Sequence, residues 1–246
     1  MKNKWIYLSP HFDDAVLSCG GLAWEQVQAG EKVEIWTICA GEPPNQEYSA
    51  FARSLHERWE TGLNAAAQRR EEDTLSCAII GASARTFSIP DCIYRMRKDG
   101  SRPICDSEDE LFQGPQVDDK ELVCWLANEI GGAAGENTKI VSPLALGNHV
   151  DHWLTRTAAE QSGGKLWYYA DYPYVLKDFA IADPSDNGEW KTVIFPVSEG
   201  GLEAWMKSIA AHRSQLSTFW DDVPSMEAAI REYYQSAGGI KLWMKG

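Results

Sequence analysis

Two short clusters of histidine and aspartate contain the residue types of a hydrolytic metal site. Their members are His11, Asp13 and Asp14 near the start of the chain, and His149, Asp151 and His152 further along. Two histidines and one carboxylate can hold a zinc ion, and a second carboxylate and a third histidine then remain for proton transfer. Of the other histidines, His56 is interpreted as solvated or loop-anchoring and His212 as structural.

The first cluster follows a short apolar run, and the sequence predicts how it is placed. Residues 5–9 read as a buried strand, and residues 15–29 read as a helix that stops at Gly30. Asp13 and Asp14 then stand where the helix begins, and the exposed N–H groups and the helix dipole favour ionised carboxylates there. This position suits Asp14 as a metal ligand. The alternative is that one of the two aspartates simply caps the helix.

The second cluster follows a predicted strand, residues 139–142, and opens a predicted helix, residues 149–161. Asn148 is suited to cap this helix, with Asp151 as its capping-box partner. The two histidines of the cluster then share one helical face, so that one can bind a metal while the other faces a substrate. Asp151 could instead orient a histidine by accepting its ring N–H. The alternative is two surface histidines in a first helical turn.

Further segments continue an alternation of strands and helices. The other predicted strands are residues 32–39, 86–89, 166–170 and 190–197, and the other predicted helices are residues 58–80, 118–130, 202–215 and 225–235. This alternation implies an α/β fold in which a mostly parallel sheet is covered by helices on both faces, a three-layer α/β/α arrangement. Two polar stretches, residues 41–49 and 96–116, are predicted loops that are long enough to wall a pocket.

The predicted fold explains how the two clusters could meet. Ligands bind at the carboxyl ends of the strands in an open parallel sheet, and both clusters follow such ends. They can therefore line one crevice. A length of 246 residues fits one large α/β domain or two small ones. We interpret residues 1–246 as a single domain, with residues 184–246 as its C-terminal extension.

The composition argues against several classes of partner. A net charge of −13 argues against a nucleic-acid-binding surface and against tight docking on an anionic membrane, but it allows a neutral sugar. No window approaches about 18 consecutive apolar residues, so no integral membrane segment is expected. Six cysteines without a CxxC pair favour a reducing cytoplasm over a disulfide framework. The oligomeric state stays open, a homo-oligomer included.

The clusters and several segments between them resemble one protein family. Residues 9–14 (SPHFDD) with Gly20 and Gly21, followed by residues 149–152 (HVDH), resemble the PIG-L/LmbE-like family of zinc-dependent N-deacetylases. The similar intermediate and later segments are 68–72 (QRREE), 89–95 (IPDCIYR), 168–174 (YYADYPY) and Ser214–Gln215. The resemblance covers roughly residues 4–216, and the order of the two paired motifs carries it.

This resemblance implies a Rossmann-like fold and an activity. Members remove acetyl groups from N-acetylglucosamine-type sugars, giving a free amine and acetate. The zinc ligands implied by the resemblance are His11, Asp14 and His152. Asp13 would be the general base that deprotonates a zinc-bound water. His149 would stabilise the oxyanion or protonate the leaving amine, with Asp151 as its orienting partner.

The resemblance also points to substrate-binding residues and to a subgroup. The residues implied to contact a small-molecule amino sugar are Arg69, Arg70, Asp91 and Tyr94. Many members carry Pro at the position of Phe12, Glu at that of Ala15 and Pro at that of Val150. No metal-binding or catalytic residue type is lost. The form with Phe12 and Ala15 resembles members that act on glycosylated natural products or surface polysaccharides more than the branch of thiol-cofactor metabolism.

Two other functions remain open at this point. The same metal site would serve hydrolysis of another amide, such as a thiol conjugate. A non-catalytic sugar-binding homologue is the second alternative, against which the intact Asp13 argues, because binding does not require a base. A site of two histidines and one aspartate also accepts iron, cobalt or manganese in place of zinc.

Overall fold

The computed structural model describes residues 2–44, 48–178 and 189–246. A seven-stranded sheet in the order β3-β2-β1-β4-β5-β7-β6 forms its centre. The strands are β1 Lys4–Ser9, β2 Lys32–Thr37, β3 Ser83–Thr86, β4 Thr138–Pro143, β5 Leu166–Tyr169, β6 Trp190–Phe195 and β7 Ile240–Lys245. Strands β1 to β5 pair in parallel, whereas β7 runs antiparallel to both of its neighbours.

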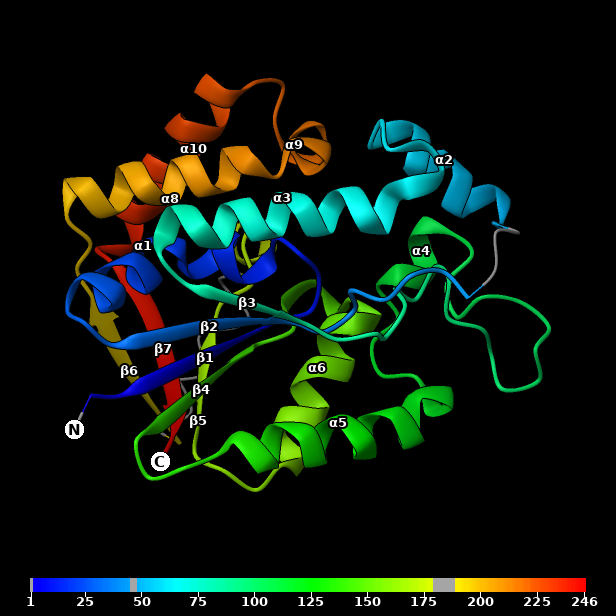
Figure 1. The fold of residues 1–246 in the computed structure, drawn as a ribbon, viewed down its shortest axis with the longest axis horizontal. Coiled ribbons are helices and arrows are strands. Elements are labelled where there is room, and N and C mark those ends of the chain that lie inside the picture. The colour runs from blue at the N-terminus through cyan, green and yellow to red at the C-terminus, as the bar shows by residue number, and fades with distance from the viewer. Residues whose placement is uncertain (1, 45–47, 179–188) are drawn as a thin grey trace.

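Helices cover both faces of the sheet. Figure 1 shows α1, α3 and α8 on one face and α5 and α6 on the other. The helices are α1 Asp14–Gln28, α2 Ala50–Arg58, α3 Ala65–Ile80, α4 Glu108–Leu111, α5 Lys120–Ala133, α6 Val150–Gln161, α7 Val175–Asp178, α8 Glu199–Ala211, α9 Arg213–Phe219 and α10 Val223–Ala237. The predicted three-layer α/β/α fold with a mostly parallel sheet is confirmed. Within the described ranges, no helix is long and apolar enough to cross a membrane.

The interior strand β1 is apolar from Trp5 to Leu8 because both of its faces are covered. Ile6 and Leu8 have no exposed surface, and Trp5 and Tyr7 on the opposite face are almost as buried. A strand that is buried on both faces reads as a continuous apolar run instead of an alternating one.

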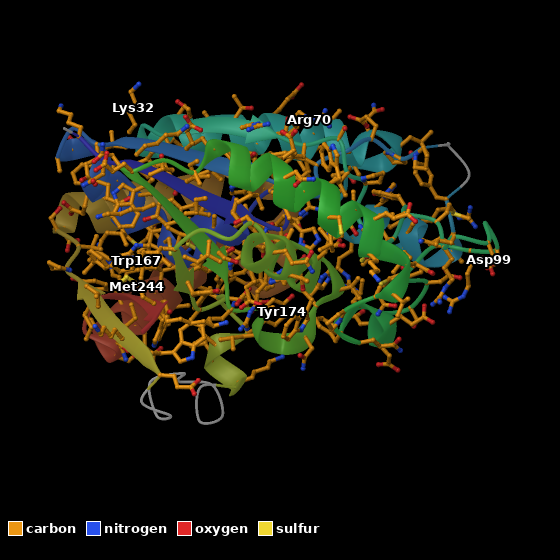
Figure 2. The ribbon with its side chains drawn as sticks, turned by 90° about the horizontal axis from the view of Figure 1, so that it is seen from below. Lys32, Arg70, Asp99, Trp167, Tyr174 and Met244 are labelled. Atoms are coloured by element: carbon orange, nitrogen blue, oxygen red, sulfur yellow. The ribbon has the colours of Figure 1, made fainter. Side chains whose placement is uncertain are left out.

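Figure 2 shows the long axis of the molecule, with the paired residues Trp167 and Met244 at one end and Asp99 at the other.

Several predicted boundaries differ from the structure. The predicted helix 58–80 is interrupted, because Glu60 and Gly62 adopt positive φ angles of 54° and 56° between α2 and α3. The predicted helix 202–215 divides at His212, whose ψ of 61° separates α8 from α9. The predicted strand 86–89 ends earlier, at Thr86. Strand β7 was not predicted. The start of the C-terminal extension at residue 184 and positions 45–47 of the first loop lie outside the described residues.

The C-terminal segment packs directly on the first helix. Trp205 of α8 is fully buried, and its Nε1 donates a hydrogen bond to the carbonyl oxygen of Val16, 2.7 Å away. The indole lies so close to α1 that a Cβ atom added at Gly20 would stand 2.6 Å from its Cδ1. Glycine at position 20 therefore permits the close approach of α8 to α1.

We expect Gly20→Ala to destabilise the protein. The new methyl group would clash with the ring of Trp205, and overpacking of this kind costs about 1–3 kcal/mol, which the better helix propensity of alanine offsets only in part. Urea unfolding measures the loss. The matched control is Gly132→Ala in α5, where the added Cβ meets nothing within 4 Å. Equal effects of the two substitutions would contradict this account of Gly20.

A buried carboxyl group in α3 makes the stability depend on pH. Asp73 has no exposed surface; it accepts a hydrogen bond of 2.9 Å from the Thr37 hydroxyl at the end of β2. Burial raises the pKa of Asp73 to about 7. An acid whose pKa is raised in the folded state contributes stability that is present below the unfolded pKa of about 4 and is lost as pH rises through about 7.

Asp73→Asn should remove this pH dependence. We expect the difference in unfolding free energy between the wild type and the variant to change by about 3 kcal/mol between pH 5 and pH 8, with the wild type losing stability relative to the variant at pH 8. Urea unfolding of both proteins at the two pH values measures it, and contributions shared by both proteins cancel. A difference that stays constant with pH would show that Asp73 does not titrate in this range.

Candidate active site and metal centre

The two histidine and aspartate clusters meet where the direction of the sheet topology reverses. Strand β1 lies between β2 and β4. From β1 the chain adds β2 and β3 on one side of it, and it then returns to add β4 and β5 on the other side. Ligands in open α/β sheets bind outside the carboxyl ends of strands at such a switch point. The first cluster follows β1 and the second follows β4. All six candidate residues are buried, with at most 9% of their surface exposed.

Asp14 lies between the two predicted histidine ligands. Its Oδ2 is 3.2 Å from Nδ1 of His11, and its Oδ1 is 3.3 Å from Nε2 of His152. Tetrahedral ligands about 2.0–2.1 Å from a zinc ion stand about 3.3–3.4 Å from one another. The types of these donor atoms and the two distances to Asp14 therefore suit a divalent metal.

His149 joins the same group of side chains. Ring nitrogens of His11, His149 and His152 lie within 4.8 Å of one another, so a set of three histidines can also be drawn. Nδ1 of His149, however, accepts a hydrogen bond from the backbone N–H of Asp151 at 3.2 Å. Among the described residues, Asp14 is the one carboxylate that contacts the rings of both His11 and His152, which favours the predicted ligand set.

Each of the two histidines has a second carboxylate behind it. Nδ1 of His152 is 2.6 Å from Asp171 Oδ1, and Nε2 of His11 is 3.1 Å from Asp151 Oδ2. Metal-binding histidines commonly hold a carboxylate on the nitrogen that faces away from the metal, which fixes the tautomer and the ring orientation. Asp171 was not predicted as a site residue. It follows β5, the next strand along from β4, so its position after a strand end was the available signal.

The carboxylate of Asp151 contacts the ring of His11 and not that of His149. Its carboxylate contacts His11 and the guanidinium of Arg95, the latter at 2.8 Å, and it reaches His149 only through its backbone N–H. Arg95 also makes two hydrogen bonds, of 2.8 and 2.7 Å, to the carboxylate of Asp119. Arg95 thereby compensates the buried charge of Asp151 through Oδ1, the oxygen that does not contact His11.

The electrostatics of this group favour a cation. Burial alone would lower the pKa of both His11 and His152, but the facing carboxylates outweigh it and raise the pKa of His152 to about 9 and that of His11 well above its usual value. Burial would raise the pKa of Asp14, yet His152 and His11 hold it well below its usual range. If the imidazoles are neutral, the negative charge of the surrounding carboxylates is not compensated. A divalent cation bound among them would compensate it.

His149 differs from the other two histidines in its charge state. Burial and the neighbouring His11 and His152 lower the pKa of His149 well below its usual value, so its ring is neutral near pH 7. Because Nδ1 accepts a hydrogen bond, the proton of the neutral ring resides on Nε2. His149 itself is the N-cap of α6, and the predicted cap Asn148 has a φ of 62° instead.

The carboxylate of Asp13 does not cap α1. Its side chain makes no capping hydrogen bond, and Oδ1 lies 3.4 Å from Nη2 of Arg69. Asp13 faces a cavity of about 130 Å³ together with His11, Asp14 and His149. The alternative in which this aspartate serves only as a helix cap is therefore wrong for Asp13.

The predicted substrate-binding residues separate into two groups. Arg69 and Asp91 line the cavity. Arg70 and Tyr94 do not line it: Arg70 binds the carbonyl oxygen of Ala40 and the carboxylate of Glu42, and the hydroxyl of Tyr94 contacts Nε2 of His56. His56 is buried, which contradicts a solvated side chain and fits a loop anchor.

Other lining residues were not predicted as site residues. They come from the loops and short helices around the mouth, and include Trp59, Phe112, Tyr174, Gln215 and Phe219. The ring of Phe112 stands edge-on to those of His149 and Tyr174, at centroid distances of 5.6 and 5.9 Å. The sequence indicates Ser214–Gln215 only as a segment that resembles the PIG-L/LmbE-like family. Large aromatic residues in polar loops were the available signal.

The fold and the site together define a class of protein. Histidines and a carboxylate gathered at the switch point of a parallel sheet, with a spare buried carboxylate on the same cavity, are the arrangement of a metal-dependent hydrolase. Residues 6–162 match the sequence model of the PIG-L family, described as GlcNAc-PI de-N-acetylase. The chain belongs to this family, as its motifs indicated.

Several similar proteins are named as deacetylases. A 2'-N-acetylparomamine deacetylase of Niallia circulans is 28% identical over 198 residues, which span 70% of this chain and 68% of the relative. The protein of the same name from Streptomyces fradiae is 29% identical over 187 residues, which span 73% of this chain but only 61% of the relative. A zinc-inhibited form of the teicoplanin deacetylase Orf2 superposes with a TM-score of 0.79 at 25% identity, covering 98% of this chain and 97% of the other.

We expect Asp171→Asn to weaken divalent-metal binding about 10–100-fold, because His152 loses the carboxylate that orients its ring. Competition with a chelator of known affinity measures the dissociation constant. Asp221→Asn, which changes an exposed carboxylate, is the control and should leave the affinity unchanged. If Asp171→Asn binds metal as tightly as the control, the orientation of His152 does not depend on Asp171.

Proposed function

We propose that this chain is a metal-dependent hydrolase that removes the N-acetyl group from an amino sugar or its glycoconjugate, releasing acetate and a free amine. The observation that carries the proposal is the carboxylate of Asp13, which serves no helix cap and lines the same cavity as His11 and Asp14, next to His152. Membership of the PIG-L family and the names of the relatives support it.

The metal is proposed to be one zinc ion per chain, held by His11, Asp14 and His152. When bound, such an ion supplies Lewis acidity for the amide carbonyl and an ionised water near neutral pH. Asp151 contacts the ring of His11 and Asp171 that of His152, each at the ring nitrogen that does not face Asp14, and these contacts fix the orientation of the two rings.

Two further residues are assigned to proton transfer and charge stabilisation. Asp13 is proposed to accept the proton of the attacking water, because its carboxylate faces the cavity and serves no cap. The neutral ring of His149 presents its Nε2–H as a donor to the developing oxyanion, and one such donor is worth roughly 3–4 kcal/mol in comparable sites.

The walls of the cavity suit a sugar. Asp91 and Arg69 offer an acceptor and a donor for hydroxyl groups, while Phe112 and Tyr174 offer rings against which the apolar face of a pyranose can pack. At the mouth, Arg58 of α2 lies 3.4 Å from Glu108 of α4, so these two charges largely balance each other. The site thus accepts a substrate whose recognised part is neutral.

The cellular setting is proposed from the cysteines. All six are free thiols and five of them are buried, which fits the reducing cytoplasm. We also propose that the chain forms a single domain, because β6 and β7 extend the same sheet as β1 to β5.

Asp13→Asn should keep the metal and lose the activity. We expect acetate release from N-acetylglucosamine glycosides to fall about 10²–10⁴-fold, since an amide cannot accept the proton of the water. Metal content, measured by elemental analysis of the same preparation, should equal that of the wild type. Undiminished acetate release with bound metal would remove Asp13 from the reaction.

The decisive first experiment couples metal analysis of the wild type to an acetate-release assay with and without chelator. Release that the chelator abolishes and added zinc or another divalent ion restores supports the proposal. Bound metal without acetate release from any N-acetylated sugar would contradict it, and thiol-conjugate amides would then be the next substrates to assay.

A further inference from the structure

Arg69 is a buried cation whose polar contacts are few. The residue belongs to α3 and only 6% of its surface is exposed. Its Nη2 lies 3.4 Å from Asp13 Oδ1, which is long for a charge-assisted hydrogen bond. Its Nε, although buried, has no hydrogen-bond partner among the described residues. Polar contacts alone therefore leave the orientation of this guanidinium weakly determined.

Two aromatic rings supply the missing support. The guanidinium carbon of Arg69 lies over the ring of Trp59 at 4.8 Å from its centroid, and over the ring of Phe12 at 5.3 Å. Both aromatic residues are buried, with 8% and 3% of their surface exposed. A guanidinium within about 6 Å of a ring centroid is attracted by the ring quadrupole, and most strongly where water is excluded. We call Phe12 and Trp59 together the Arg69 seat.

The seat is connected to the proposed base by the chain itself. Phe12 directly precedes Asp13, so the ring that supports Arg69 and the carboxylate that Arg69 contacts leave the backbone at adjacent positions. Trp59 stands at the end of α2, just before the residues with positive φ that separate α2 from α3. The interruption of the helix thus allows a ring to lie over a residue of the following helix.

We propose that Phe12 and Trp59 are positioning residues for the reaction, which hold Arg69 so that its guanidinium orients the carboxylate of Asp13. The inference rests on the proposed function for its catalytic consequence, whereas the seat itself is a property of the fold. Among the hydrogen bonds of the described residues, Arg69 is the one side-chain partner of the Asp13 carboxylate. Loss of the seat should therefore affect turnover more than substrate binding.

The first test is Phe12→Leu, which removes one ring and keeps an apolar side chain. We expect kcat for acetate release to fall at least about 10-fold while KM changes less than about 3-fold, because small misplacement of a reacting group lowers turnover steeply. The matched control is Phe87→Leu. Phe87 is also buried and also lies beneath an arginine, with the guanidinium carbon of Arg85 at 4.5 Å, but Arg85 pairs with Glu129 and not with Asp13.

A second pair of variants separates support by the ring from packing. Trp59→Phe keeps a ring over the guanidinium, whereas Trp59→Leu removes it. We expect Trp59→Leu to lower kcat like Phe12→Leu and Trp59→Phe to restore most of the turnover. This pair also keeps the proposal open to test if Phe12→Leu fails to fold. Equal kcat for the two Trp59 variants would overturn the role of the rings.

The third test does not depend on activity. In a protein labelled with ¹⁵N at arginine, the Nε–H signal of Arg69, identified by its loss in Arg69→Lys, should lie upfield because the group stands over ring faces. Trp59→Leu should move it downfield and Trp59→Phe should not. An unchanged signal would overturn the seat even in an active enzyme. A shifted signal in a protein that releases no acetate would support the seat and refute the proposed function.

Discussion

The contact of one carboxylate with two imidazoles is the constraint on which the site depends. Asp14 opens α1 directly after β1, and His152 lies in the first turn of α6 beyond β4, so their 3.3 Å contact requires these two strands to be neighbours. Burying a carboxylate without a partner is costly, and the arrangement is stable only if opposite charge is close by. The switch point of the sheet satisfies this demand, because two loops diverge there and leave room between them.

Charge compensation continues outward from this contact in layers. Behind the two rings lie Asp151 and Asp171, and behind Asp151 lies Arg95, which in turn is held by Asp119. Each buried group thus has a partner of opposite sign or a hydrogen-bond donor, as buried ionic networks require. The layers run from the strand ends into the loops, so the ligand rings are oriented by residues far from them in the sequence. Rigidity of the proposed metal centre is a property of this whole network.

Local patterns predicted the part of the structure that local chemistry decides. An apolar run before His11 and a helix after Asp14 placed the first cluster at a strand end, and the rule for parallel sheets then brought the second cluster beside it. Partners such as Asp171 and Arg95 could not be assigned by the same reasoning, because their pairing is set by tertiary contacts. Strand β7 was missed for a similar reason: it gains its neighbours β5 and β6 only in the folded sheet.

Two of the incorrect local predictions fall where the cavity is walled. Glu60 and Gly62 interrupt the predicted helix 58–80, and this interruption ends α2 beside Trp59. The break at His212 likewise separates α9, whose Gln215 and Phe219 line the mouth. Departures from regular local structure are expected at functional sites, where a side chain must be presented at a defined place. The sheet thus positions the proposed chemistry, while the interrupted helices set the shape of the pocket that selects the substrate.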